Sequence, residues 1–223
     1  SQIIEVLARE HGRVGIVARG ARRPSSRWRS VLQPFQAVRL SWGGRGSLQT
    51  LRAAETASQE PPLQGMALMA AFYLNELILN FIRRGDPHPG LFMAYAEALA
   101  ELRQGPDSEP ALRRFELRLL AEAGYGLNLD HDVLNDVALD PHGSYEYRIE
   151  HGPVPAEAGQ AALVLSGLTL LAISRGELTD PGVLQSAKRL LRGVLAHYLD
   201  GRTLRTRQVL ASMRRAPAVP QLP

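Results

Sequence analysis

The feature that most restricts the fold is a change in hydrophobic spacing at Pro61-Pro62. Before it, apolar residues come in short β-branched runs punctuated by glycines, which is typical of strands joined by tight turns. After it, apolar residues recur every three or four positions, as in Leu63 to Arg84, which is typical of amphipathic helices. We therefore expect an α+β protein of two domains, residues 1–60 built of strands and residues 61–223 built of helices.

The first domain contains four clear strand candidates: Ile3 to Ala8, Val14 to Ala18, Val31 to Leu40 and Ser47 to Ala53. The first two flank a turn and predict a hairpin, and the glycine-rich loop at residues 43–46 predicts a tight turn between the last two. A lone open sheet of this size would expose its edges. We therefore expect four or five strands to close into a small β-barrel. The chain begins at Ser1 without a methionine, and we expect part of a first strand to precede it.

The second domain reads as a series of helices interrupted by one irregular segment. The expected helices cover residues 63–84, 88–104, 109–124, 156–175, 180–199 and 203–215. Residues 127–155 are too polar and too rich in proline and aspartate for a helix, and within them Ser144 to Ile149 alternates like a strand. We expect a long loop or a small β insertion there.

Charge is distributed unevenly along the chain, although the formal net charge is only +4. Residues 1–60 hold 10 arginines against 4 glutamates, residues 61–182 hold 8 basic and 17 acidic groups, and residues 183–215 hold 8 basic groups and one aspartate. Two basic zones thus flank an acidic middle, which suggests a polyanion as a partner. The alternative is that these charged groups lie on the solvated faces of ordinary helices and strands and bind no partner.

Several function classes lack their required residues. The chain has no cysteine, which excludes disulfides, cysteine-ligated metals and thiol nucleophiles and suits a reducing, intracellular compartment. No apolar run is long enough for a membrane span, because polar residues interrupt the best candidate, Met66 to Ile82. The single lysine, Lys188, is not in a P-loop, and no serine lies in a Gly-x-Ser-x-Gly frame. We find no catalytic constellation and expect no enzyme.

The histidines do not predict a metal site. His131 and Asp132 are adjacent, as in some metal-dependent phosphohydrolases, and His142 and His151 follow in the same segment. Metal ligands have to be held by rigid elements and oriented by further partners, whereas this segment is loop-like and its spacings match no compact ligand pattern. We therefore expect neither a metal nor another cofactor.

The strongest functional signal is an arginine-rich segment between two predicted strands, residues 19–29. It holds five arginines and Trp28 within eleven residues. Arginines can neutralise phosphates, and Trp28 or Trp42 could stack on unpaired bases, a combination found in proteins that bind single-stranded nucleic acids. The alternatives are a solvated loop for the arginines and partial burial against the barrel for Trp28. We expect the DNA contacts to include Arg19, Arg22, Arg23, Arg27, Trp28 and Arg29.

The ordered motifs of the chain resemble those of a known family. These motifs are Val17 to Arg22, Leu32 to Phe35, Gly43 to Gly46, Leu51 to Glu55, Tyr73 to Leu77, Glu109 to Leu117 and Gly124 to Gly126. Their succession resembles the RecO family of bacterial recombination mediators over nearly the whole chain. The resemblance implies an amino-terminal OB-fold followed by a helical domain, and it adds Arg45 to the expected DNA surface.

The resemblance also implies partners and a cellular role. It implies a non-enzymatic DNA repair protein of the RecF pathway in the cytoplasm, at the nucleoid. Such a protein binds single- and double-stranded DNA, anneals strands coated by single-stranded DNA-binding protein (SSB), and acts with RecR to load RecA. Some family members carry a cysteine cluster where this chain has residues 127–155. Without cysteines, we expect that segment to be held by packing around Tyr145, Tyr147 and Ile149.

The resemblance places a site for the SSB tail, an acidic peptide that ends in phenylalanine, on the predicted helix 109–124. A peptide of this kind needs an apolar socket with a guanidinium at its rim to bind the carboxylate. The expected residues are Leu112, Arg113, Arg114 and Phe115, with Arg113 favoured as the carboxylate ligand. The alternative is that Phe115 and Leu119 belong to the core while one arginine pairs with Glu109, Glu116 or Glu122 on the same helix.

Two other function classes compete with this interpretation. A transcription regulator with an amino-terminal DNA reader and a helical ligand-binding domain would need a helix-turn-helix. The β-branched runs and glycines of residues 1–60 argue against that motif. An enzyme such as a phosphohydrolase built around His131 and Asp132 is the third possibility.

Overall fold

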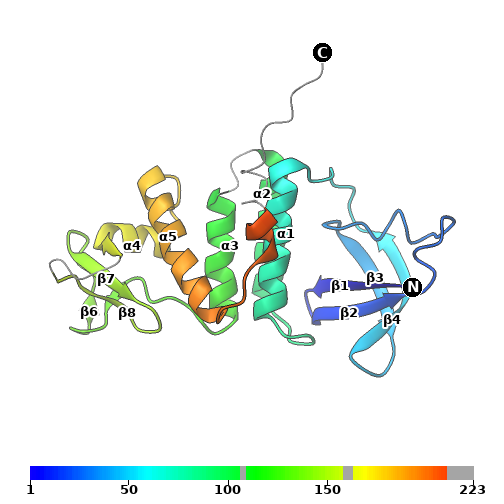
Figure 1. Cartoon of the computed structure of the whole chain (residues 1–223), viewed down its shortest axis with the longest axis horizontal. Helices are drawn as coiled ribbons and strands as arrows, with labels where there is room; N and C mark the ends of the chain where they lie inside the picture. The colour runs from blue at the N-terminus through cyan, green and yellow to red at the C-terminus, as the bar shows by residue number, and fades with distance from the viewer. Residues whose placement is uncertain (106–108, 158–162, 210–223) are drawn as a thin grey trace, which may run out of the picture.

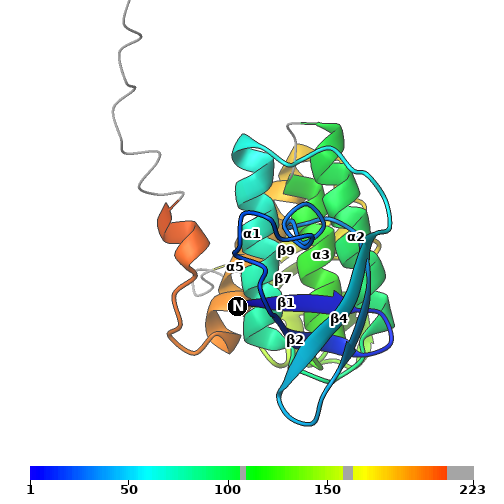
Figure 2. The same ribbon diagram turned by 90° about the vertical axis from the view of Figure 1, so that its right-hand side faces the viewer.

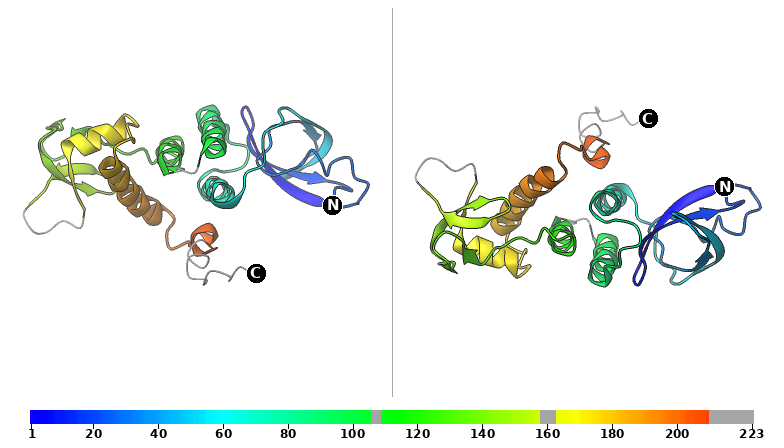
Figure 3. Two further views of the ribbon diagram at one scale, coloured as in Figure 1. Left: turned by 90° about the horizontal axis from the view of Figure 1, so that it is seen from above. Right: turned by 90° about the horizontal axis from the view of Figure 1, so that it is seen from below.

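The computed structural model describes residues 1–105, 109–157 and 163–209. An amino-terminal β-sheet lies at one end of the long axis, helices occupy the middle, and a smaller β region lies at the other end (Figure 1). The views from above and below show the same order (Figure 3). Seen along the axis from the sheet side, the amino-terminal strands lie in front of the helices (Figure 2).

The amino-terminal sheet has four strands: β1 Gln2–Ala8, β2 Gly12–Ala18, β3 Val38–Gly43 and β4 Leu48–Thr56. Their spatial order is β1-β2-β4-β3, with β1/β2 and β3/β4 antiparallel and β2/β4 parallel. The predicted first hairpin and the glycine-rich turn between β3 and β4 are confirmed. All of residues 1–60 are described, and they form strands and turns without a helix, so the helix-turn-helix of a transcription regulator is absent there.

Two expectations about this sheet are wrong. The sheet is open instead of a closed barrel, because β1 and β3 form its two edges and no described strand joins them. The expected strand at residues 31–40 begins only at Val38, because Pro34 lacks a backbone N–H and Phe35 has a φ of 63°. Arg103 fixes this non-strand segment by donating from Nη2 to the Phe35 carbonyl oxygen at 2.6 Å.

Four long helices lie close to their expected positions: α1 Gly65–Phe81, α2 Pro89–Gln104, α3 Glu109–Glu122 and α5 Pro181–Tyr198. Helix α1 is shorter than predicted, because the chain turns to extended backbone at Ile82 and pairs with the first hairpin at Arg84. Of the expected last helix, residues 205–209 are helical and the remainder lies outside the described residues. None of the helices in the described part of the chain combines the length and apolar composition of a membrane span.

The prediction of one continuous helix over residues 156–175 is wrong for the residues that the structure describes. Residues 158–162 lie outside them. Strand β9 (Val164–Ser166) precedes a shorter helix α4 (Gly167–Ser174). The physical reason is an N-cap: the Ser166 hydroxyl accepts a hydrogen bond from the Thr169 N–H at 3.1 Å, so the helix begins after that residue.

The irregular segment is a small β insertion, one of the two predicted forms. It contains β5 His131–Asp132, β6 Val137–Ala138, β7 Ser144–Arg148 and β8 Gly152–Pro155. Strand β7 lies between β8 and β9, which confirms the strand predicted from Ser144. Tyr145 is buried and its hydroxyl accepts a hydrogen bond from the Asp140 N–H at 2.9 Å, while Tyr147 and Ile149 pack against the helical core.

The buried apolar residues form two clusters of unequal size. The smaller contains Ile16, Ala18, Ala21 and Leu51 from the amino-terminal sheet and its following loop. The larger runs through all the helices and the insertion, with Leu74, Leu77, Leu119 and Leu191 fully buried at its centre. Division of the chain into two domains at about residue 60 stays a prediction.

Candidate nucleic-acid interface

The arginine-rich segment leaves the end of β2 and crosses the surface in successive turns. Its backbone is fixed locally, since the N–H groups of Arg23, Ser26 and Arg29 donate to carbonyl oxygens three residues earlier at 3.0–3.2 Å. Arg19, Arg22, Arg23, Arg27 and Arg29 are all exposed. Within the described part of the chain, none of the five guanidiniums has an ion pair. They form a concentration of unneutralised positive charge.

Trp28 is partly buried, which is the second of the two alternatives considered for it. Its side chain is half-buried and packs against the smaller apolar cluster. The Arg27 guanidinium carbon lies 4.2 Å from the indole centroid, a cation–π contact that covers one side of the ring. A base could stack on that side only after Arg27 moves away.

Arg45 lies apart from the other expected DNA contacts. It occupies the turn that follows β3, whereas the arginine-rich segment leads into the beginning of the same strand. Its side chain is exposed. The turn is fixed by the Gln49 side chain, which donates from Nε2 to the Gly46 carbonyl oxygen at 2.8 Å. The predicted basic residues therefore border the sheet at two places.

The two adjacent arginines of α3 point in different directions. Arg113 is turned inward, with 7% of its side chain exposed, and its Nη2 lies 2.8 Å from Oε1 of the fully buried Glu116. The Tyr73 hydroxyl donates to the same carboxylate oxygen at 2.5 Å. Burial raises the pKa of Glu116, while Arg113 and the bond from Tyr73 oppose that rise. Arg113 therefore has the intrahelical partner that the alternative interpretation foresaw.

Arg114 is turned outward, toward α2. Its guanidinium pairs with Glu101, and the side chains are each 41% exposed. Between α2 and α3 lies a groove of about 420 Å³ that includes Met93, Arg114, Phe115 and Arg118 in its lining. Phe115 and Leu112 are both buried in the helical core. Of the four residues expected at the SSB-tail site, Leu112 and Arg113 are buried in the core, whereas Arg114 and Phe115 line the groove.

Sequence reasoning missed Arg118 and Met93 at this groove. The signal for Arg118 was present, because it follows Arg114 by four positions and therefore lies on the same face of the helix. Met93 is 46% exposed on α2, and nothing in its own helix distinguishes it from a core methionine. That Met93 lines a groove follows only from the packing of α2 beside α3.

His131 and Asp132 make turn contacts in the β insertion. The Asp132 carboxylate accepts hydrogen bonds from the backbone N–H groups of Leu134 and Asn135 at 2.9 and 3.3 Å. His131 Nε2 lies 3.0 Å from an oxygen of Asp136. Within residues 1–105, 109–157 and 163–209, no three acidic or histidine side chains form a group that could hold a metal ion. The Asp132 contacts therefore fix the turn that joins the two short strands β5 and β6.

Comparison with known proteins covers both halves of the chain. The family description "Recombination protein O N terminal" matches residues 1–59, and "Recombination protein O C terminal" matches residues 63–208. A curated DNA repair protein RecO from Azoarcus sp. (strain BH72) is 45% identical over 217 residues, which cover 96% of this chain and 89% of the relative.

Two further relatives with the same name show similar agreement. The protein from Nitrosospira multiformis is 46% identical over 212 residues, covering 94% of this chain and 88% of the relative. The protein from Alkalilimnicola ehrlichii is 47% identical over 225 residues, covering 97% of this chain and 87% of the relative. The chain therefore belongs to the RecO family of DNA repair proteins.

Proposed function

We propose that this chain binds single- and double-stranded DNA through its amino-terminal part and anneals complementary strands that are coated by SSB. It acts in the cytoplasm, at the nucleoid, with RecR as a partner and RecA loading as the consequence, and it performs no covalent chemistry. The observation that carries the proposal is the arginine-rich segment, with five exposed guanidiniums that have no ion pair within the described residues. Neutralising two phosphate backbones lowers the repulsion that opposes pairing.

The topology of the amino-terminal sheet supports an OB-fold as its framework. An OB-fold is a five-stranded, partly open Greek-key barrel. The order β1-β2-β4-β3, with its single parallel pair β2/β4, is what four of these five strands would form if the fifth bridged the edges at β1 and β3. We propose accordingly that residues 1–60 form a nucleic-acid-binding domain and residues 61–223 a helical domain.

We further propose that the SSB tail docks against α3. The α2–α3 groove offers an apolar floor at Phe115 and two guanidiniums, Arg114 and Arg118, at its side. A phenylalanine ring with a free carboxylate matches this combination. Arg113, the ligand favoured by the family motif, would have to share or leave Glu116 to reach the peptide. Leu112 then supports the site from the core.

The deciding experiment is annealing of complementary, SSB-coated oligonucleotides without ATP. We expect this chain to accelerate annealing, and we expect the acceleration to fall when the SSB lacks its acidic tail. A chain that binds the DNA but leaves the annealing rate unchanged would refute the proposed activity. A requirement for ATP would refute its non-enzymatic character.

A further inference from the structure

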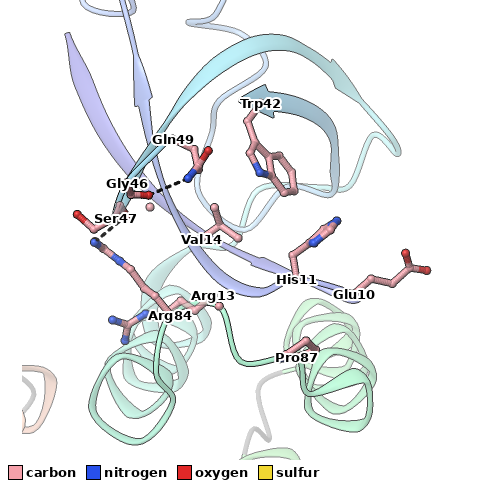
Figure 4. A pocket seen from close by; sticks show the side chains of 12 residues that line it. Glu10, His11, Arg13, Val14, Trp42, Gly46, Ser47, Gln49, Arg84 and Pro87 are labelled. Carbon is pink, nitrogen blue, oxygen red and sulfur yellow. Dashed lines mark hydrogen bonds between the residues drawn. The ribbon is translucent and has the colours of Figure 1, made fainter. Parts of the chain in front are cut away.

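A cavity of about 470 Å³ lies where the amino-terminal sheet meets the connection between α1 and α2 (Figure 4). Its walls come from the β1–β2 turn, from strands β2, β3 and β4, from the β3–β4 turn and from the α1–α2 connection. The side chains used below are those of Glu10, His11, Arg13, Trp42, Gln49 and Arg84. The volume lies within the range of small-molecule sites in proteins, roughly 300–1,000 Å³.

Two aromatic rings form a corner in this cavity. The ring centroids of His11 and Trp42 are 5.3 Å apart, and their planes are inclined at 82°. Figure 4 shows both rings directed into the same space, one from the β1–β2 turn and the other from β3. A third flat ring can stack on one of these two rings while its edge points at the face of the other. Aromatic groups favour both of these contacts.

The wall opposite the rings is held by backbone contacts. The Gly85 N–H donates to the Arg13 carbonyl oxygen at 2.9 Å, and Arg84 forms bridges with the first hairpin. Gly12 has a φ of 62°, and a Cβ at this position would overlap the backbone carbonyl of Asp86. The α1–α2 connection therefore lies against the hairpin with no room for a side chain, and the cavity is formed before any ligand arrives.

Charge in the cavity is divided between its two ends. Arg13 and Arg84 both pair with Glu5, so two guanidiniums share one carboxylate and that end keeps a net charge of +1. The Glu10 carboxylate lies on the other side of the cavity, beside His11 (Figure 4). A ligand with a flat ring and one anionic group would therefore lie with its anion toward Arg84 and away from Glu10.

We propose that this cavity receives one unpaired base of a single DNA strand, with the base stacked on Trp42 and its phosphate toward Arg84. The Gln49 amide, which lines the same space, can bond to the base edge. This inference rests on the proposed DNA binding and adds a stacking site that is separate from Trp28. Arg27 covers one side of the Trp28 ring, whereas Trp42 faces the cavity.

The chain has only two tryptophans, which permits a direct test by fluorescence. In Trp28→Phe, all tryptophan emission comes from Trp42, and in Trp42→Phe all of it comes from Trp28. Each variant is titrated with a thymidine oligonucleotide, with an abasic strand of the same length and with thymidine monophosphate. Anisotropy of a labelled oligonucleotide measures DNA binding in parallel.

We expect the oligonucleotide to quench Trp28→Phe more strongly than Trp42→Phe, and the abasic strand to quench neither variant. Quenching confined to Trp42→Phe would overturn the assignment, as would equal quenching by the abasic strand. Thymidine monophosphate that binds as tightly as the oligonucleotide would make the cavity a nucleotide site and refute the strand assignment. If anisotropy shows binding without Trp42 quenching, this inference fails alone, whereas absence of binding removes the proposed function as well.

Two further variants test the corner without altering the sheet core. His11 is exposed, so His11→Ala should fold normally and weaken oligonucleotide binding by about threefold, from loss of one aromatic contact. Glu10→Gln should strengthen binding, because it removes a negative charge from the cavity. Unchanged affinity in both variants would overturn the proposal even if Trp42 were quenched.

Discussion

The salt dependence of DNA binding tests the arginine-rich segment most directly. We choose Arg22→Ala, Arg23→Ala and Arg29→Ala in one variant and leave Arg27 in place, because Arg27 lies over the Trp28 ring. The three substituted side chains are exposed and make no ion pair within the described residues. Surface substitutions of this kind usually change the free energy of unfolding by no more than about 0.5 kcal/mol. A change in binding can therefore be read as a loss of DNA contacts.

The expected magnitude follows from counterion release. Each phosphate neutralised on a single strand contributes about 0.7 to the slope of log K against log salt. Loss of three contacts should therefore flatten the slope by about 2. The affinity should fall about 100-fold at 0.1 M salt, and the difference should shrink as salt approaches 1 M.

The assay is anisotropy of a labelled thymidine oligonucleotide between about 0.05 and about 0.5 M salt. A control with the same change in net charge replaces Arg118, Arg148 and Arg175 by alanine, since these three arginines are exposed and belong to the acidic middle of the chain, where Arg118 and Arg148 are paired with glutamates. The control should keep the wild-type slope. Equal flattening in the two triple variants would show that total charge, and not the segment, governs binding, and would refute the reasoning.

Three further outcomes follow from the packing. Arg114→Ala should weaken binding of an SSB-tail peptide at little cost in stability. Arg113→Ala should lower the free energy of unfolding in urea by about 3 kcal/mol, because it leaves the buried Glu116 carboxylate without the cation of its ion pair. Equal peptide affinity in both variants and the wild type would remove α3 from the site. Hydrogen bonds from residues 205 and 206 outweigh burial and lower the pKa of Glu76, so its contribution to stability is present above about pH 4.5 and is lost as the pH falls. Glu76→Gln should accordingly cost about 1 kcal/mol at neutral pH and less in acid, and a cost independent of pH would contradict this. Gly12→Ala should lower the thermal midpoint far more than Gly20→Ala, since both have positive φ but only the first lacks room for a Cβ.

The fold was predictable where local pattern and tertiary packing agree. The first hairpin and the long helices have clear hydrophobic periods, and packing preserves them. The prediction failed at residues 31–40, where apolar residues suggested a strand but Pro34 and a positive φ at Phe35 exclude regular pairing. It also failed near Val164, where a short apolar run fits a strand or a helix equally well until β7 offers a pairing partner.

For the candidate site, the sequence predicts which side chains are exposed in the arginine-rich segment, but not how the arginines of α3 are oriented. Exposure of the arginine-rich segment follows from its polarity, and the structure agrees. Arg113 and Arg114 are neighbours in sequence and therefore point about 100° apart on a helix. Which of them faces the core depends on the position of Tyr73 on α1 as well as on that of Glu116 on α3. No pattern within a single helix contains it.

The arrangement of charge also determines how the two basic zones can cooperate. Helices α1 to α3 lie between the amino-terminal sheet and α5, which carries the exposed Arg189 and Arg192 (Figure 1). Interactions between exposed charges are largely screened beyond about 10 Å at 0.1 M salt. The two zones should therefore contact DNA independently, so Arg189→Ala and Arg192→Ala should add their loss of binding free energy to that of the arginine-segment variant. A loss in the combined variant well below that sum would show that the two zones are energetically coupled, and would contradict the expectation that they contribute independently.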